Sequence, residues 1–331
     1  MTADIAEVLR GAPGPDLAAA GVLRTRATQV LRPSGALARL DEIAVWLGAW
    51  QRTARPRVAQ PSLLVFVGDH GVAAEGVSAY PSDVTAAMLK ALEEGVATAN
   101  AMAAAVGASV HVFDVGVGNP TASLAGAPAL GADRFRECFD TGRRAVTESD
   151  ADLLVLGEMG IGNTTAASAV TAALLGVAAD ACTGRGTGVD DAAYERKKAV
   201  VAAASRRVAE AAPLEILREV GGTELAAIAG AAVEARLRSI PVVLDGFVVC
   251  ASVAPLEVLR PGALDNSIAG HRSSEPGHAL LLERLGKRPL LDLDMRLGEG
   301  SGALATIPLI KLAAAAVTDV ATFDEWGVEQ R

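Results

Sequence analysis

The stretch Asp152-Leu-Leu-Val-Leu156, followed by Gly157-Glu-Met-Gly-Ile-Gly-Asn-Thr-Thr165, decides the fold of this chain. The apolar run is short and continuous, which is typical of a strand buried on both faces of a parallel sheet. The glycines after it allow a tight turn, and the Ala-rich segment from Ala166 onward predicts a helix. Backbone N–H groups and the partial positive charge of a helix N-terminus make such a turn a seat for an anion. A carboxylate, Glu158, lies inside this predicted seat.

Strands and helices alternate along the rest of the chain. Four further apolar runs predict strands at 62–67, 109–114, 240–244 and 289–292. Between them, helical patterns occupy residues 84–106, 164–178, 190–212, 222–238 and 275–286. This alternation predicts an α/β fold, a doubly wound and mostly parallel sheet with helices on both faces. We expect residues 55–300 to form this large α/β domain, which carries the site, and 1–54 with 301–331 to form a small helical subdomain from the two chain ends.

Composition excludes several classes of partner. The net charge of -9 and an aromatic content of 3% argue against nucleic-acid binding, which favours basic patches and stacking platforms. Three cysteines without CxxC spacing fit a reducing compartment, and no signal peptide is visible, so we expect a cytoplasmic protein. Residues 159–179 carry no charge, but their polar side chains and the lack of basic flanks favour a buried helix over a membrane span.

Polar, glycine-bearing loops follow each of the five predicted strands. They contain Asp69 and His70, then Asp114, then the Gly157–Thr165 turn, then Asp245, and finally the segment from Asp292 to Gly302. The carboxyl ends of parallel strands share one edge of a sheet, where ligands bind. The five loops together therefore predict one composite small-molecule site, although each glycine alone could serve only to make a tight turn.

Several familiar motifs fit incompletely. The turn resembles a phosphate loop of the GxxxxGK[ST] type, but Asn163 stands where the lysine belongs, which disfavours triphosphate hydrolysis. The segment beginning at Gly116 lacks the third glycine of a dinucleotide fingerprint, and Ser301 lacks the first glycine of a GxSxG elbow. His271 and His278 are seven apart with Pro276 between them, so we favour pocket lining or loop ordering over metal binding.

Three charged residues have alternative interpretations. Lys197 could neutralise a bound phosphate, or it could lie on a solvated helix face. Glu299 lies in a glycine turn before a helix, where it could be a general base or simply a helix-start acid. Glu158 has the same two interpretations, and next to a phosphate it would contact sugar hydroxyls or a ligand N–H, because like charges repel.

Longer motifs identify a family. They are Gly68-Asp-His-Gly-Val-Ala-Ala-Glu-Gly-Val-Ser-Ala-Tyr-Pro81, Gly157 to Thr165, Gly186-Thr-Gly-Val-Asp190, Pro241-Val-Val-Leu-Asp-Gly-Phe247, His271-Arg-Ser-Ser-Glu-Pro-Gly-His278 and Arg296-Leu-Gly-Glu-Gly-Ser-Gly302. With these motifs, residues 30–327 resemble the nicotinate-nucleotide–dimethylbenzimidazole phosphoribosyltransferase family, which makes the lower-ligand nucleotide of cobalamin.

The resemblance implies a reaction and a set of residues. Nicotinate mononucleotide and 5,6-dimethylbenzimidazole would give α-ribazole 5′-phosphate and nicotinate, with inversion at C1′. Glu299 takes the position of the catalytic base. The phosphate, ribose and nicotinate positions fall on Glu158, Gly160, Gly162, Asn163, Thr164, Gly186 and Lys197. The resemblance also implies a homodimer and no metal or other cofactor.

The segment that would border the base pocket contains Asp69, His70, Ser78, Tyr80 and Met88. Tyr80 and Met88 make this wall apolar, which leaves dimethylbenzimidazole, benzimidazole and adenine all open as the base. Core packing on a helix is an equal alternative for Met88. Further pocket candidates are Asp245, His271, Ser273 and Glu275.

The chain departs from the family near its start. The family usually shows Lys-Pro-x-Gly-Ser-Leu-Gly-x-Leu-Glu, where this chain has Arg32-Pro-Ser-Gly-Ala-Leu-Ala-Arg-Leu-Asp41. We expect this to change packing or a nearby lid. Two other functions are weaker: a non-catalytic sensor of bases or nucleotides, which would have no need to keep Glu299, and a transferase using pyrophosphorylated ribose, which would want Mg²⁺ carboxylates.

Overall fold

The protein is described by a computed structural model that covers residues 2–329. Its strands are β1 (Pro61–Gly68), β2 (Ser109–Gly116), β3 (Leu153–Met159), β4 (Val242–Leu244), β5 (Ser267–Ala269), β6 (His271–Arg272) and β7 (Leu291–Asp292). Its helices are α1 (Thr2–Arg10), α2 (Leu17–Gln29), α3 (Arg39–Gln51), the 3₁₀ helix η1 (Gly71–Glu75), α4 (Val84–Glu93), α5 (Thr98–Val106), α6 (Ala132–Thr147), α7 (Asn163–Leu175), α8 (Ala179–Cys182), α9 (Asp191–Arg207), α10 (Pro213–Val220), α11 (Thr223–Leu237), α12 (Phe247–Leu259), α13 (Pro276–Arg284), α14 (Ser301–Leu304), α15 (Ile307–Thr318) and α16 (Phe323–Trp326).

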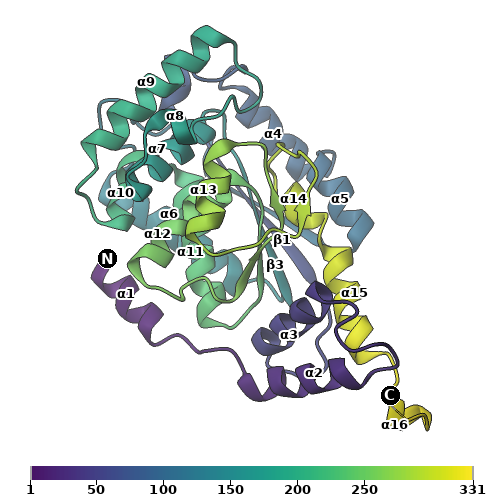
Figure 1. Ribbon diagram of the computed structural model, residues 1–331. Coiled ribbons are helices and arrows are strands. Elements are labelled where there is room, and N and C mark those ends of the chain that lie inside the picture. The colour runs from purple at the N-terminus through teal and green to yellow at the C-terminus, as the bar shows by residue number, and fades with distance from the viewer. Residues whose placement is uncertain (1, 330–331) are drawn as a thin grey trace.

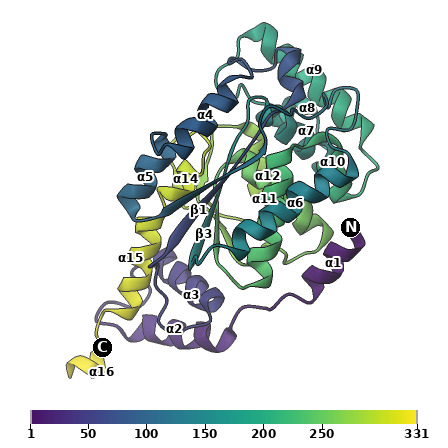
Figure 2. The same ribbon diagram turned by 180° about the vertical axis from the view of Figure 1, so that it is seen from behind.

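A five-stranded parallel sheet lies at the centre of the molecule, in the order β2-β1-β3-β4-β5 (Figures 1 and 2). The crossover from β1 to β2 places α5 on one face, and the crossover from β2 to β3 places α6 on the other. The sheet is therefore doubly wound, as predicted. The strand order reverses between β1 and β3, and the carboxyl edge at such a switch point is where open α/β sheets bind ligands.

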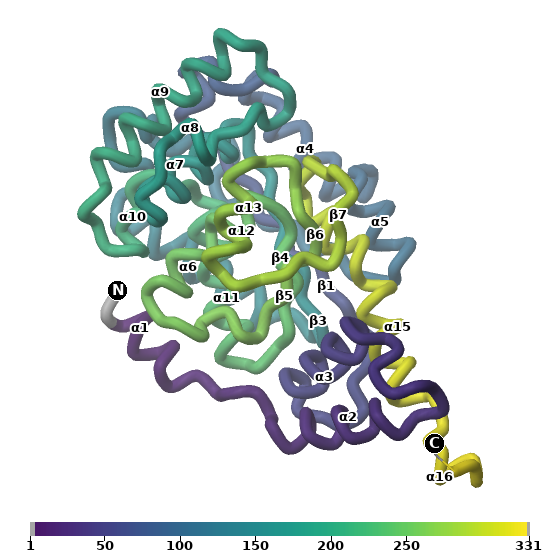
Figure 3. The backbone as a smooth tube through the Cα atoms, viewed as in Figure 1, coloured from purple at the N-terminus to yellow at the C-terminus, as the bar shows by residue number. Residues whose placement is uncertain are grey.

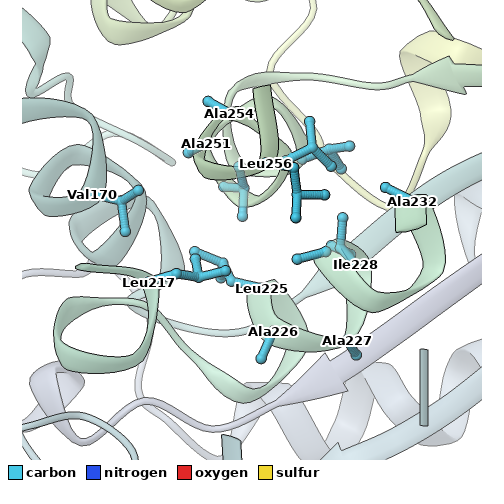
Figure 4. Packing of buried hydrophobic residues seen from close by; sticks show 14 of the residues in the cluster. Val170, Leu217, Leu225, Ala226, Ala227, Ile228, Ala232, Ala251, Ala254 and Leu256 are labelled. Carbon is cyan, nitrogen blue, oxygen red and sulfur yellow. The ribbon is translucent and has the colours of Figure 1, made fainter. Parts of the chain in front are cut away.

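Alternate side chains of β1 serve two separate cores. Leu64 and Phe66 belong to the cluster shared with α6, α7, α10, α11 and α12, and Figure 4 shows how tightly the last four of these helices meet. Leu63, Val65 and Val67 belong to the cluster on the opposite face, shared with α3, α4, α5, α14 and α15. All eight residues of β1 are buried, which explains its continuous apolar run.

Two sequence predictions of strands are wrong in part. Residues 291–292 do form a strand, but it pairs with β6 in a small two-stranded sheet, visible in Figure 3, rather than in the main sheet. The fifth strand of the main sheet is β5, whose three residues are too few to give a periodic signal. Strand β2 is not covered on both faces, because it lies at the edge of the sheet and is partly exposed along its length.

The predicted helix at 84–106 is two helices, α4 and α5, separated by the left-handed Gly95. The predicted terminal helices do form, and α2, α3 and α15 pack against one another. They also share one hydrophobic cluster with the sheet. The division into residues 55–300 and two chain ends stays a prediction, and residues 1, 330 and 331 of those ends lie outside the described part of the chain.

One segment of the described chain is long and apolar enough to cross a membrane, Ser301–Thr318, and 56% of it is buried inside the fold. It comprises α14 and α15, whose Ile307 and Ile310 pack in the cluster under the sheet. Burial of this kind is typical of a core helix. The uncharged stretch at 159–179 forms the end of β3 and the largely buried α7.

Candidate active site

The turn after β3 holds a buried carboxylate. Glu158 is 7% exposed, and its Oε2 accepts a hydrogen bond from the Nδ2 of Asn163, the first residue of α7. Burial raises the pKa of Glu158 well above its ordinary value, and the nearby charges of Asp245, Glu224 and Glu299 add to the rise. The turn needs glycine at Gly162, where φ is 100°. Three of the amides in the Gly157–Thr165 stretch already have partners: Ile161 N donates to Thr85 Oγ1 at 3.2 Å, Asn163 N to Gly160 O at 3.1 Å and Thr165 N to Gly162 O at 2.9 Å.

The loop carrying Glu299 lies directly against this turn. Glu299 N donates to the carbonyl oxygen of Glu158 at 3.1 Å, and a Cβ atom at Gly157 would lie 2.7 Å from the Glu299 carbonyl carbon. Gly298, Glu299 and Gly300 all have positive φ, so Glu299 holds a backbone conformation that usually belongs to glycine. Sequence analysis expected these two segments at one sheet edge, and they do meet there.

The Glu299 side chain is buried and oriented. It is 3% exposed, and its Oε2 accepts a hydrogen bond from Ala99 N at 3.2 Å, in the first turn of α5. Burial raises the pKa of Glu299, the Ala99 N–H opposes this, and the charge of Asp245 adds to it. A carboxylate with one oxygen held by an amide and a raised pKa has the properties of a general base.

Lys197 does not lie on a solvated face. It is 1% exposed, and its Nζ donates to Thr164 Oγ1 at 2.9 Å. Burial lowers its pKa, while the charge of Glu275 works in the opposite direction. Within the described residues, no carboxylate lies at ion-pair distance from Nζ. A buried cation that makes no ion pair with the described residues is suited to receive an anionic ligand.

Gly186 lies close to Lys197 and is hydrogen-bonded to two other segments, those that carry Glu275 and Arg296. Its N–H donates to Glu275 Oε1 at 2.8 Å, and its carbonyl accepts from Arg296 Nη1 at 3.2 Å. A Cβ atom at Gly186 would lie 3.4 Å from Lys197 Nζ, and φ there is 55°. The predicted phosphate-side residues therefore come from the turn after β3, the loop that carries Gly186 and helix α9, which carries Lys197.

A buried His–Glu pair lies behind the turn, and sequence analysis missed one half of it. His70 Nε2 contacts Glu224 Oε1, and both side chains are fully buried. A Cβ atom at Gly160 would lie 3.0 Å from Glu224 Oε1, so the turn packs directly on the pair. Glu224 follows Gly221-Gly222-Thr223 and is the first acid of the Ala-rich α11. The glycine pair Gly221-Gly222 was the only local sequence signal for a site residue here. It follows a helix, whereas the predicted site loops all follow strands.

Asp245 and His271 lie against the segment that follows Glu299 in the chain. Asp245 Oδ1 accepts from Ala303 N at 2.9 Å and lies 3.5 Å from His271 Nε2. Burial raises the pKa of Asp245 even though His271 and several amides favour its charged form. His278 Nδ1 accepts from Ser273 N at 3.0 Å, and burial lowers the pKa of His278 to about 3. These contacts match the loop-ordering interpretation of the two histidines.

The expected base-pocket segment is more open. Asp69 Oδ2 accepts from Gly118 N at 2.7 Å, which ties the β1 and β2 loops together. Ser78 Oγ accepts from Tyr80 N at 3.2 Å, and Tyr80 is 52% exposed. Met88 is partly buried against the second core cluster, while His70 is turned toward Glu224. Among the described residues, no group of three or more His, Cys, Asp and Glu side chains gathers in a metal-ligand arrangement.

The fold and this edge together define an α/β protein in which two buried carboxylates and a buried lysine gather at the carboxyl edge of a doubly wound sheet. Comparison with known proteins agrees: a family model described as phosphoribosyltransferase matches residues 12–328. Nicotinate-nucleotide–dimethylbenzimidazole phosphoribosyltransferases from Cereibacter sphaeroides and Ruegeria pomeroyi are each 47% identical, over 96% and 98% of this chain and 94% and 97% of their own lengths.

Solved structures agree as well. The crystal structure of the enzyme of that name from Thermus thermophilus superposes with a TM-score of 0.90 at 41% identity, covering 96% of this chain and all of that one. A structure of CobT from the same organism gives a TM-score of 0.91 at 43% identity, covering 95% of this chain. The chain belongs to the nicotinate-nucleotide–dimethylbenzimidazole phosphoribosyltransferase family. The resemblance and the fold class inferred from the sequence are confirmed.

Proposed function

We propose that the protein transfers the 5-phosphoribosyl group of nicotinate mononucleotide to 5,6-dimethylbenzimidazole or a related base, with inversion at C1′. The products are α-ribazole 5′-phosphate and nicotinate. The observation that carries the proposal is the contact between the buried Glu158 and Glu299 segments at the β1/β3 switch point, with buried Lys197 bound to the same turn through Thr164. Membership of the family supports the same activity.

The transfer needs one base and no acid. The bond between C1′ and the nicotinate ring nitrogen breaks, and its electron pair returns to that nitrogen, which leaves neutral. A nitrogen of the incoming base forms the new bond to C1′, and the proton on its other ring nitrogen goes to Glu299. The raised pKa of Glu299 suits it to this task. Such a base contributes roughly 10²–10⁴-fold, and holding both reactants in line contributes more.

Lys197 and the turn after β3 suit the phosphate and ribose. The Lys197 ammonium lacks a protein counter-ion in the described chain, and its Thr164 partner is the second residue of α7. A phosphate there would gain a charge-assisted hydrogen bond and the field of the helix N-terminus. Glu158 would then accept from ribose hydroxyls rather than contact the phosphate.

The acidic surroundings favour a substrate that is positive at its reacting end. The charges of Asp245, Glu224 and Glu299 raise the pKa of Glu158, and the charge of Asp245 also raises the pKa of Glu299. Nicotinate mononucleotide carries its positive charge on the pyridinium, and C1′ gains positive charge as the bond breaks. Buried carboxylates stabilise that charge more strongly than water would.

The exposed apolar side chains near Glu299 suit a flat aromatic base. Leu297 stands two residues before Glu299 and is 52% exposed, and Tyr80, in the segment that the resemblance assigns to the base pocket, is exposed to the same extent. A benzimidazole placed between apolar groups would remove them from water, which stabilises the complex by about 25 cal/mol per Å² of apolar area.

We further propose that the protein acts in the cytoplasm as a homodimer, as the resemblance implies.

A turnover assay tests the proposal. The protein is incubated with nicotinate mononucleotide and 5,6-dimethylbenzimidazole, and products are separated by chromatography with mass detection. We expect nicotinate and ribazole phosphate in equal amounts. Binding of both substrates without either product would contradict the proposal and indicate a sensor instead.

A further inference from the structure

A second polar cleft lies at the opposite edge of the sheet. It has a volume of about 980 Å³ and is bounded by the loop after α3, the start of β3, the turn before β4 and the C-terminal half of α15. Figure 1 shows these segments below the sheet, away from the α13–α14 end that carries the active site. The volume is in the range of small-molecule sites.

The lining of this cleft has the opposite sign to the protein as a whole. Five basic residues face two acidic ones, in a chain whose net charge is -9. The basic residues are Arg52, Arg55, Arg57, Arg238 and Lys311, and the acidic ones are Asp152 and Asp319. A concave surface lined by one sign of charge concentrates ions of the other sign.

Two of these arginines have side chains that are unpaired within the described part of the chain. Arg52 donates to Gly14 O, Lys311 donates to Val106 O, and Arg238 pairs with Glu234. The guanidinium groups of Arg55 and Arg57 make no hydrogen bond or ion pair with the described residues. They are two residues apart on one loop, so both can reach a single multiply charged anion.

The loop that carries them is held in place by side chains. Gln51 forms bonds in both directions with the backbone of Arg57: its Nε2 donates to Arg57 O at 2.7 Å, and its Oε1 accepts from Arg57 N at 3.1 Å. Asp152 Oδ2 accepts from Ala59 N at 2.6 Å. Arg52 and Ser239, on two sides of the cleft, are both non-glycine residues with positive φ. Both residues stand where a helix ends, Arg52 at the end of α3 and Ser239 after α11, and left-handed residues are common at helix ends.

We propose that this cleft is a second anion-binding site, which takes a small ligand bearing a diphosphate group. Guanidinium groups bind phosphate oxygens in pairs and remain charged at every physiological pH. The fixed loop presents Arg55 and Arg57 with little ordering left to occur on binding. The site is distinct from the catalytic one, because β1 and β3 begin at this cleft and end at the active site.

Calorimetric titration with inorganic pyrophosphate, and separately with ADP, tests the proposal. Nicotinate mononucleotide is present at saturation without the base, so the catalytic phosphate position is already filled. We expect one pyrophosphate per chain, and binding weakened roughly tenfold or more in the R55A/R57A double variant, which loses two charged contacts. The control R136A/R260A removes two exposed arginines elsewhere and should bind as the parent does.

Three outcomes would overturn the proposal: no binding of either probe, equal binding by R55A/R57A and the parent, or binding that disappears when nicotinate mononucleotide is added. Binding of ADP but not pyrophosphate would also count against a diphosphate as the recognised group. The turnover assay on the parent and on both double variants keeps this test separate from the proposed function. A parent protein that turns over normally but binds no pyrophosphate contradicts only the second site.

Discussion

Ala38 holds a backbone conformation that alanine rarely adopts, with φ 41° and ψ -100°. The family motif usually has glycine at this position, and glycine adopts a positive φ more readily than alanine does. At the two ends of the motif, Arg32 pairs with Asp41 where the family usually shows lysine and glutamate. Ala38 is therefore a strained residue just before α3.

Ala38→Gly should stabilise the protein. A non-glycine residue in a left-handed conformation destabilises the folded state by about 1–2 kcal/mol. Replacing it with glycine removes this strain, but the greater flexibility of glycine in the unfolded chain offsets part of the gain. We expect the free energy of unfolding to rise by about 1 kcal/mol, measured by urea denaturation. A lower value for the variant would show that the surroundings hold Ala38 without strain.

Glu299→Gln should slow turnover by roughly 10²–10⁴-fold, because glutamine cannot take the proton from the incoming base. It retains an oxygen to accept from Ala99 N, so the loop and the affinity for nicotinate mononucleotide should change little. Steady-state kinetics and calorimetric titration separate the two effects. A rate close to that of the parent would remove Glu299 from the role of base.

Lys197→Ala should mainly weaken binding of nicotinate mononucleotide, by about 1.5–3 kcal/mol for a lost charged hydrogen bond. Lys287→Ala is the matched control, because Lys287 is a second lysine whose pKa is lowered by burial, yet it donates to Leu264 O and Ser267 O away from the site. Both variants should lose stability, but only the first should lose nucleotide affinity. Equal affinity in the two would exclude a phosphate contact.

At the scale of elements, α6 and α11 cross so closely that glycine is required on both. A Cβ atom at Gly142 would lie 1.7 Å from Ala227 O, and one at Gly230 would lie 1.9 Å from Phe139 O. Gly230→Ala should therefore destabilise the protein by about 1–3 kcal/mol or more, as overpacking does. Gly21→Ala in α2 is the control, because nothing lies within 4 Å of its Cβ position, and it should stabilise by up to about 1 kcal/mol. Thermal unfolding of both variants checks the pair, and equal melting temperatures would contradict it.

The elements that could be predicted from sequence were those with their own local signal. The buried run of β1 and the capped start of α9, where Asp190 accepts from Ala193 N, are examples. β5 was missed because three residues carry no period, and its strand character comes only from pairing with β4. The small β6–β7 sheet has the same origin, because tertiary contacts decide short strands.

At the scale of the whole molecule, the site residues that could be predicted from the sequence are those located at the carboxyl ends of strands. Asp69, Glu158 and Asp245 stand directly after β1, in the end of β3 and after β4, so topology alone brings them together. Glu224 enters from the start of a helix, and the burial of Lys197 depends on how α9 packs on α7. No local pattern encodes either, so both needed the folded chain.

The buried acids should make stability depend on pH. The folded-state pKa of Glu158 is raised, so the folded protein binds more protons than the unfolded chain above pH 4.5, the ordinary carboxyl value. The contribution of Glu158 to the free energy of unfolding is therefore fully present below about pH 4.5, and it is lost as the pH rises. Urea denaturation of parent and Glu158→Gln between pH 4.5 and roughly 8 should show the parent losing stability relative to the variant. Parallel curves would contradict a raised pKa.

The loop of Glu299 is fastened at both ends, by its own amide to the Glu158 carbonyl and by Ala303 N to Asp245. The surface around Ser78 and Tyr80 is more open to water, since Tyr80 is 52% exposed. Under the proposed mechanism, evolution can alter which heterocycle is admitted by changing that outer surface while Glu299 remains undisturbed. A single ancestral scaffold can in this way give rise to enzymes that differ in their preferred nucleobase but share one chemical step.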